Sequence, residues 1–244
     1  MQYADLTPST PPLPPLPTHP PTHPCACLSR GYGNSQGEPT EEGLQKDAVA
    51  VMAHISQRRD IHQGRVLLFG RSLGGAVALY AAHARPGLAT GIILENTFTS
   101  VSDMVDVVFP VLSYFKWAVL RIRWRSVDLI SSVTAPILFI SGAKDQLVPS
   151  WMVQRLHDAA AASTHREMFS VADGTHNDTF QKAGPEYAIR LRAFLLRVCG
   201  PNALQPRLSG TAAASESAAV AAAKVTEAPI GYQPRVGDAL RGEL

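Results

Sequence analysis

The sequence has few cysteines, no long apolar run and little excess of either charge. Its cysteines, Cys25, Cys27 and Cys199, have neither zinc-binding spacing nor the even count of a disulfide framework, so we expect a reducing, intracellular compartment and no metal. The 22 basic and 20 acidic side chains leave a net charge of +2, which argues against nucleic acid as a partner. No stretch is typical of a transmembrane helix or a signal peptide, and no pattern indicates a cofactor.

Both ends of the chain have low complexity. Nine of the 19 prolines lie between Pro8 and Pro24, so we expect residues 1–28 to be a disordered segment rather than a buried strand. Its Pro-Pro-Leu-Pro-Pro-Leu-Pro core at 11–17 fits a ligand for an SH3-type groove, although a plain tail is the simpler interpretation. Residues 200–244 are Ala-rich and unpatterned, which also predicts disorder. The folded domain is expected at 29–199.

Between these ends, apolar strands alternate with amphipathic helices. That alternation predicts an α/β fold, with a mostly parallel sheet covered by helices on both faces. The pattern places strands at 65–69, 90–95, 136–142 and 166–171, and helices at 40–57, 73–84, 150–161 and 185–198.

The turn after the first of these strands reads Gly70-Arg71-Ser72-Leu73-Gly74. In a strand–turn–helix context this G-x-S-x-G pattern predicts a nucleophile elbow that exposes Ser72 Oγ. We expect a Cβ at Gly70 or Gly74 to collide with its neighbours, and Leu73 N–H to serve as an oxyanion donor at the helix N-terminus. The alternative is a Gly-rich turn with a capping serine.

Two further residues follow predicted strands. Asp145 and His176, like Ser72, lie just beyond a strand's carboxyl end, and the order Ser, Asp, His is that of α/β-hydrolases. His176 would take the serine proton, and Asp145 would orient the imidazole. Asp145 could instead be a turn residue, and Glu95 or Asp103 is the runner-up for the acid.

The stretch at 101–126 is apolar and aromatic and ends in several arginines. We interpret it as a small cap over the active site, whose apolar face would suit an acyl chain. The alternatives are a buried connecting helix pair and peripheral contact with an anionic membrane through 101–125.

Several blocks closely resemble the bem46-like family of α/β-hydrolases. They are Phe69-Gly70-Arg71-Ser72-Leu73-Gly74-Gly75, Glu95-Asn96-Thr97-Phe98, Phe139-Ile140-Ser141-Gly142 with Asp145-Gln146-Leu147-Val148-Pro149, and Asp173-Gly174-Thr175-His176-Asn177-Asp178. The resemblance runs from about Arg30 to Val198. It implies a serine hydrolase with Ser72, Asp145 and His176 as its triad, acting on small-molecule or protein-bound acyl groups, including palmitoyl thioesters. It also implies association with a membrane.

Part of the family pattern is missing from this sequence. We expect the chain to lack the family's N-terminal strands and membrane anchor, because the residues before Arg30 are Pro-rich. The family's His-Gly oxyanion motif is absent as well, which leaves Leu73 N–H as the only predicted donor. The strand at 65–69 would then form an exposed apolar sheet edge.

Three functions therefore remain open. The first is a serine esterase or thioesterase that works through an acyl-enzyme. The second is a catalytically impaired hydrolase that acts as an interaction protein, which the missing oxyanion motif favours. The third is an aminopeptidase, for which the sequence offers no carboxylate pair to bind an amino terminus.

Overall fold

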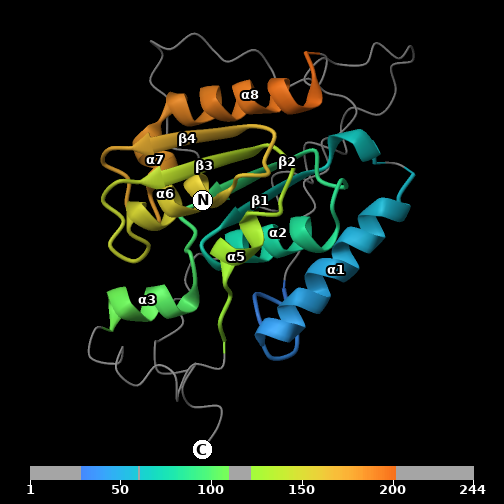
Figure 1. Ribbon diagram of the computed structural model, residues 1–244, viewed down its shortest axis with the longest axis horizontal. Helices are drawn as coiled ribbons and strands as arrows, with labels where there is room; N and C mark the ends of the chain where they lie inside the picture. Colours follow the sequence, from blue (N-terminus) through green and yellow to red (C-terminus); the bar gives the residue numbers. More distant parts are fainter. Residues whose placement is uncertain (1–28, 60, 110–121, 202–244) are drawn as a thin grey trace, which may run out of the picture. The chain divides into compact units, whose positions relative to one another are not determined.

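The computed structural model describes residues 29–59, 61–109 and 122–201 (Figure 1). The chain divides into two units, and every described residue lies in the unit Cys25–Leu204. The Pro-rich segment with its SH3-type stretch at 11–17, residues 110–121 of the expected cap and the Ala-rich tail from 202 lie outside the described residues. The domain boundaries drawn from the sequence stay a prediction.

Four parallel strands form one sheet in the described part of the chain. Their spatial order follows the sequence: β1 (Leu67–Arg71), β2 (Gly91–Glu95), β3 (Ile137–Gly142) and β4 (Arg166–Val171). The register pairs Gly70 with Leu94, Leu94 with Phe139, and Phe139 with Met168. Strands β2 and β3 are buried along their whole length, as expected for central strands covered on both faces.

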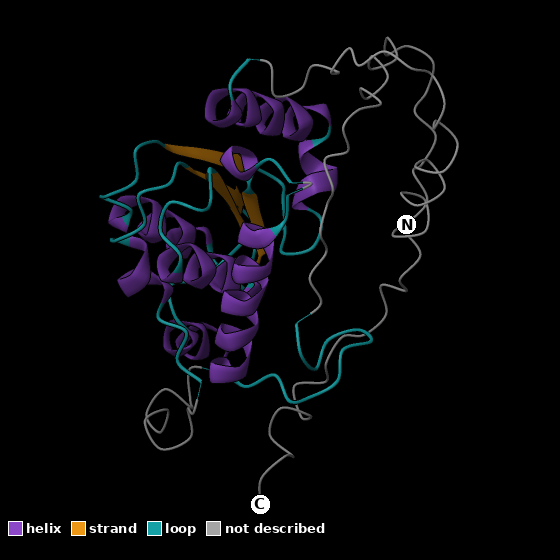
Figure 2. Ribbon diagram, turned by 90° about the vertical axis from the view of Figure 1, so that its right-hand side faces the viewer, coloured by secondary structure: helices purple, strands orange, loops and turns teal. Residues whose placement is uncertain are grey.

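Helices cover the two faces of this sheet (Figures 1 and 2). Helix α8 packs on one face, and α2 and α6 pack on the other. The helical elements are α1 (Glu41–Gln57), the 3-10 helix η1 (Gln63–Arg65), α2 (Leu73–Ala84), α3 (Val101–Val108), α5 (Ser126–Ile130), α6 (Ser150–Ala159), α7 (Thr179–Ala183) and α8 (Pro185–Cys199).

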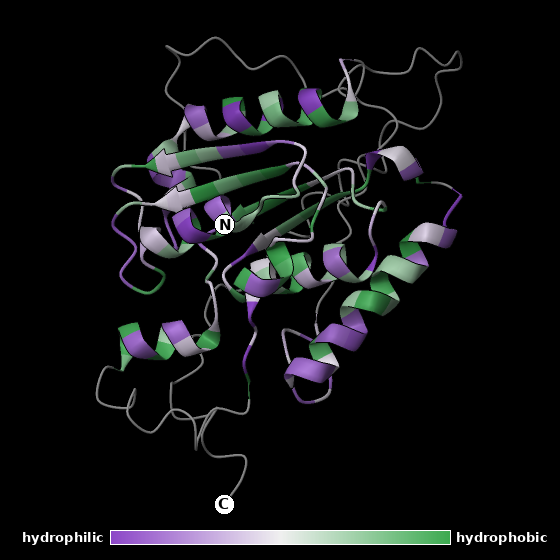
Figure 3. Ribbon diagram, viewed as in Figure 1, coloured by the Kyte–Doolittle hydropathy of each residue, from purple (hydrophilic) through white to green (hydrophobic). Residues whose placement is uncertain are grey.

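The two-residue period of the strands divides the core between the two faces. Ile92 and Leu94 of β2 pack with Leu79 of α2 on one side. Ile93, between them, packs with Phe194 of α8 on the other side. The central strands β2 and β3 are accordingly mostly apolar (Figure 3), because neither of their faces meets water.

Several elements differ from the sequence prediction, β1 and α7 most clearly. Strand β1 begins at Leu67, two residues after the predicted start, and continues to Arg71, two residues beyond the predicted end, because Gly70 and Arg71 still pair with Leu94 and Glu95. The strand therefore runs directly into Ser72. Helix α7 was not predicted, since its five residues are too few for a helical apolar period to be recognised.

Strand β1 forms an edge of the sheet. Within the described ranges it pairs with β2 alone, and the Phe69 side chain is 54% exposed. This matches the apolar edge expected from the sequence.

Helix α3 begins where the expected cap begins. The Ser100 side chain caps it by accepting a hydrogen bond from Asp103 N–H, as Ser commonly does at this position. Val101, Met104 and Val107 recur at helical spacing and pack beside the buried cluster that contains Trp124. Among the residues that the structure describes, no helix is long and apolar enough to cross a membrane.

Candidate active site

Ser72 occupies the turn between β1 and α2 in a strained conformation. Its φ of 52° and ψ of −124° lie in a region that non-glycine residues rarely adopt and that costs about 1–3 kcal/mol. Ser72 N–H donates to Glu95 O at 3.0 Å, and Ser72 O accepts from Gly75 N–H at 2.9 Å and from Thr97 Oγ1 at 2.8 Å. The N–H and the carbonyl of Ser72 are thus both held by hydrogen bonds. The Ser72 side chain makes no capping hydrogen bond to α2.

The glycines around Ser72 have different roles. A Cβ on Gly70 would lie 2.2 Å from Gly74 O and 2.6 Å from Gly75 Cα, and one on Gly75 would lie 2.6 Å from the Thr97 side chain. A Cβ on Gly74 would have no described atom within 4 Å. The prediction that both flanking glycines avoid a clash is therefore right for Gly70 and wrong for Gly74, and the close packing of α2 falls on Gly75 instead.

The structure brings Asp145 and His176 together. His176 Nδ1 and Asp145 Oδ2 are 2.7 Å apart, and the Asp145 side chain is fully buried. The other carboxylate oxygen, Asp145 Oδ1, accepts from the N–H groups of Leu147 at 2.9 Å and Val148 at 2.8 Å. The carboxylate is therefore held in one orientation by its own loop, and across the described ranges His176 Nε2 has no hydrogen-bond partner.

Ser72 lies at the same end of the sheet, since β1, β3 and β4 all point their carboxyl ends in one direction. Within the described part of the chain, no hydrogen bond joins Ser72 Oγ to His176. Catalytic hydrogen bonds are often long in structures without substrate.

Leu73 is the first residue of α2. Its N–H has no acceptor within the helix and lies at the positive end of the helix dipole. This is the position expected of an oxyanion donor.

The alternative acids have other partners. Glu95 is buried and accepts a hydrogen bond from Tyr187 OH of α8. Asp103 Oδ2 accepts from Thr99 Oγ1. Neither carboxylate contacts His176, so Asp145 is the one that is placed to orient the imidazole.

The pair of Glu95 and Tyr187 fixes α8 against the carboxyl end of β2. Burial, together with the hydrogen bond to Glu95, raises the pKa of Tyr187 well above its usual value. The phenol therefore stays protonated and donates to Glu95 at any physiological pH.

Ion pairs and turn contacts shape the two loops that carry the acid and the base. Lys144 pairs with Asp173, which lowers the pKa of that exposed carboxyl. Asp178 Oδ1 accepts from Thr175 N–H at 2.7 Å and from Thr175 Oγ1 at 2.8 Å, and these bonds lower the pKa of Asp178. Both carboxylates thus organise the loops.

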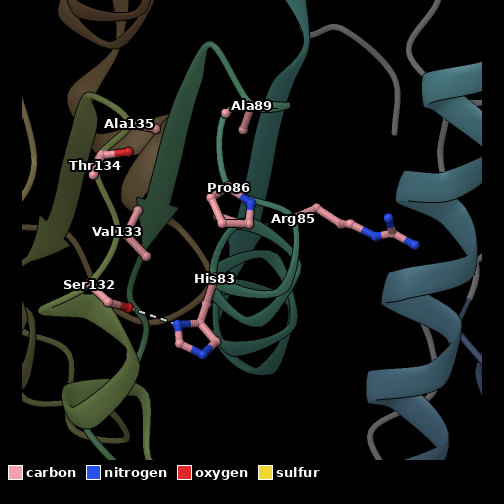
Figure 4. Close-up of a pocket in the computed structure, with 10 residues that line it drawn as sticks. His83, Arg85, Pro86, Ala89, Ser132, Val133, Thr134 and Ala135 are labelled. Atoms are coloured by element: carbon pink, nitrogen blue, oxygen red, sulfur yellow. Dashed lines mark hydrogen bonds between the residues drawn. The ribbon is translucent and has the colours of Figure 1, made fainter.

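A second serine–histidine pair lies at the opposite end of the strands, beside a small pocket (Figure 4). His83 Nδ1 and Ser132 Oγ are 2.7 Å apart, but Ser132 Oγ also donates to Leu129 O at 2.8 Å. Since a hydroxyl has a single hydrogen, His83 must donate to Ser132 rather than accept from it. This pair cannot activate the serine as a nucleophile.

An apolar surface adjoins Ser72. Leu73 is partly exposed and packs against the same buried cluster as Val101, Met104 and Val107 of α3. In the described ranges, no group of three or more His, Cys, Asp or Glu side chains could hold a metal ion.

Sequence reasoning assigned no role to the residues that connect these loops. Asn96 and Thr97 follow β2 directly, are fully buried and bond to the loops of Ser72 and His176. The signal that was available is a run of polar residues immediately after a uniformly apolar strand.

A parallel sheet with a strained serine after one strand and an Asp–His pair after two others is the arrangement of an α/β-hydrolase, and comparison with known proteins confirms this fold class. Residues 25–127 match the family model described as serine aminopeptidase, S33. Esterase Pf2001 of Pyrococcus furiosus is similar in fold, with a TM-score of 0.54 and 20% identity over 70% of this chain and 69% of that one. A puromycin-hydrolyzing peptidase of Mycobacterium tuberculosis has a TM-score of 0.53 and 18% identity, over 68% of this chain and 26% of that one.

The chain contains an α/β-hydrolase domain whose homologues include bem46 and WAV2, which confirms the resemblance found in the sequence. WAV2 of Arabidopsis thaliana, an alpha/beta hydrolase domain-containing protein, is 39% identical over 65% of this chain and 55% of its own length. Protein bem46 of Schizosaccharomyces pombe is 35% identical over 62% of this chain and 50% of its own. The chain thus spans about half the length of these relatives. The similarities support a hydrolase.

Proposed function

We propose that this domain is a serine hydrolase that cleaves an ester or thioester through an acyl-enzyme. The observation that carries the proposal is the 2.7 Å contact between His176 Nδ1 and Asp145 Oδ2, at the same sheet end as a serine with a φ of 52°. Ser72 is the nucleophile, His176 the general base and acid, and Asp145 the group that fixes the imidazole tautomer.

In this mechanism Ser72 Oγ attacks the acyl carbonyl while its proton moves to His176 Nε2. Collapse of the tetrahedral intermediate breaks the bond to the leaving alcohol or thiol, which takes the proton from Nε2. Water then attacks the acyl-Ser72 ester, passes a proton to Nε2 and releases the acid, and Ser72 regains its proton. Leu73 N–H stabilises the oxyanion in both halves.

The substrate class is supported by the surface next to Ser72. Leu73 and the α3 residues Val101, Met104 and Val107 present apolar side chains that are only partly buried. Such a surface favours an apolar acyl group, including the palmitoyl thioester that the family resemblance implies.

The test is labelling of the full 244-residue chain with a fluorophosphonate probe, which reacts covalently with activated serines. We expect labelling of the wild type and of Ser132→Ala, because the pair of Ser132 and His83 cannot generate a nucleophile. Labelling should be lost in Ser72→Ala and His176→Ala.

Turnover of short and long p-nitrophenyl esters and acyl thioesters would then define the acyl preference. A folded, monodisperse chain that takes up no label would contradict the hydrolase and support the interaction protein. Equal labelling of the wild type and Ser72→Ala would place the reaction at another residue.

A further inference from the structure

Glu95, the last residue of β2, and the two residues after it, Asn96 and Thr97, together contact every loop that carries a proposed triad residue. Glu95 O accepts from Ser72 N–H at 3.0 Å, and Thr97 Oγ1 donates to Ser72 O at 2.8 Å. Asn96, between them, reaches the loops of His176 and Asp145. All three residues are buried.

The Asn96 side chain uses both ends of its amide. Nδ2 donates to Thr179 Oγ1 at 2.8 Å and lies 3.2 Å from His176 O and 3.3 Å from Thr175 O. An NH₂ group has two hydrogens, so one bonds Thr179 and the other is shared between the two carbonyls. Oδ1 accepts from Gly142 N–H at 2.8 Å.

These bonds connect the loops of the acid and the base through one side chain. Gly142 ends β3 and its carbonyl accepts from Asp145 N–H at 3.2 Å, so its position sets where the Asp145 loop begins. Another partner of Asn96, the carbonyl oxygen of His176, lies in the same residue as the imidazole that contacts Asp145. Asn96 therefore ties the main chain of His176 to Gly142, the residue from which the Asp145 loop starts.

The backbone of Asn96 also suits asparagine. Its φ is 44°, in the left-handed region where Asn and Asp are enriched among non-glycine residues. Only an amide combines tolerance of this φ with a donor and an acceptor on one short side chain. Because Asn96 is completely buried, a lost bond here is not replaced by water.

We propose that Asn96 is a positioning residue for the hydrolase reaction, acting through His176 by holding its loop in register with that of Asp145. The inference rests on the proposed function. Asn96 contacts neither the nucleophile's side chain nor the apolar surface, so it acts on the rate of chemistry rather than on substrate binding.

The test compares Asn96→Asp with the wild type on a short p-nitrophenyl ester. Aspartate keeps the size, the tolerance of positive φ and the acceptor for Gly142 N–H, but it turns an oxygen toward the two carbonyls in place of Nδ2. We expect kcat to fall about 10²-fold with KM unchanged, as displacement of a catalytic group by about 1 Å can cause. Thr179→Val removes one acceptor of Asn96 Nδ2 at constant shape and should also lower kcat. This variant tests the proposal if Asn96→Asp does not fold.

The control is Ser141→Ala. Ser141 is buried next to Gly142, and its Oγ has no hydrogen-bond partner among the described residues, so removal of this hydroxyl should leave kcat unchanged. In a His176→Ala background, adding Asn96→Asp should cost no further activity, since residues that act as a unit are not additive. An equal loss in both backgrounds, or a rise in KM alone, would overturn the positioning role.

A measurement by proton NMR, which requires no substrate turnover, tests this inference separately from the proposed function. The His176 Nδ1 proton bonded to a carboxylate gives a far-downfield proton NMR signal, which should be present in the wild type and Ser141→Ala and lost in Asn96→Asp. If the wild type takes up no fluorophosphonate, the hydrolase proposal fails, yet this signal still decides whether Asn96 holds the pair. An unchanged signal in Asn96→Asp would contradict the inference in either case.

Discussion

Asp145 uses its two carboxylate oxygens for different purposes. Oδ1 is occupied by the N–H groups of Leu147 and Val148, and Oδ2 meets His176 Nδ1. The two backbone N–H groups can bond only to an acceptor. An isosteric side chain at this position must therefore direct an oxygen toward them, which fixes its orientation.

We therefore expect Asp145→Asn to lower kcat by about 10⁴-fold. The new amide must keep its oxygen on the two backbone N–H groups, which turns its NH₂ toward His176 Nδ1. That ring nitrogen then has to accept, the proton moves to Nε2, and Nε2 can no longer take the proton of Ser72. Steady-state ester hydrolysis measures the effect, with Asp173→Asn as a control for an exposed carboxylate paired with Lys144. A similar loss in both variants would contradict the tautomer argument.

The glycines of the elbow give a second prediction at single residues. Gly70→Ala would place a Cβ 2.2 Å from Gly74 O, and neither strand nor helix backbone can yield locally, so we expect a loss of at least about 3 kcal/mol in unfolding free energy. Gly74→Ala meets open space in the described structure and lies in α2, so it should stabilise by about 0.5–1 kcal/mol. Urea denaturation of the two variants checks both signs, and equal destabilisation would refute the distinction.

Helix α8 depends on one buried polar contact as well as on its apolar face. Tyr187 and Phe194 pack on β2 and β3, and the Tyr187 hydroxyl supplies the hydrogen bond for buried Glu95. The helix thus satisfies a carboxylate that would otherwise be buried without a partner.

Removing that donor in Tyr187→Phe should cost about 1–3 kcal/mol near neutral pH, because Glu95 stays buried and unpaired. The pKa of Tyr187 is raised in the fold, so the protonated phenol stabilises the protein fully below the pKa of an unfolded tyrosine, about 10. That contribution declines as the pH rises above about 10. The gap in unfolding free energy between wild type and Tyr187→Phe should therefore be widest at about pH 8 and narrower at about pH 11. If the difference in unfolding free energy between the two proteins did not depend on pH, the Tyr187 hydroxyl would not be its source.

The sequence predicts whole elements better than the contacts between them. Strand β4 and helix α2 begin and end at the predicted residues, because an apolar run or period and a turn mark each of them. The positions of Ser72, Asp145 and His176 after strands were predicted for the same reason. Asn96 was not, since its partners Gly142 and His176 lie 46 and 80 residues away, and no local pattern reports such distances.

At the scale of the whole molecule, the described sheet has two unlike edges. Strand β4 carries charges near its edge, where Arg190 of α8 pairs with Glu167. Such charges discourage pairing with another chain. Strand β1 presents Phe69, 54% exposed, and no charged side chain before Arg71.

We expect Phe69→Lys to keep the full chain monodisperse to a higher concentration than the wild type. A lysine on an edge strand opposes the addition of a second sheet edge, and it removes the apolar side chain that would stabilise such a contact. Ile189→Lys is the matched control, since Ile189 is similarly exposed at 57% but lies on α8, which has no open backbone edge. Sedimentation velocity across a concentration series separates the two variants. If both lysines suppress association equally, exposed apolar area and not the β1 edge drives it, and if neither does, the β1 edge is covered in the full chain.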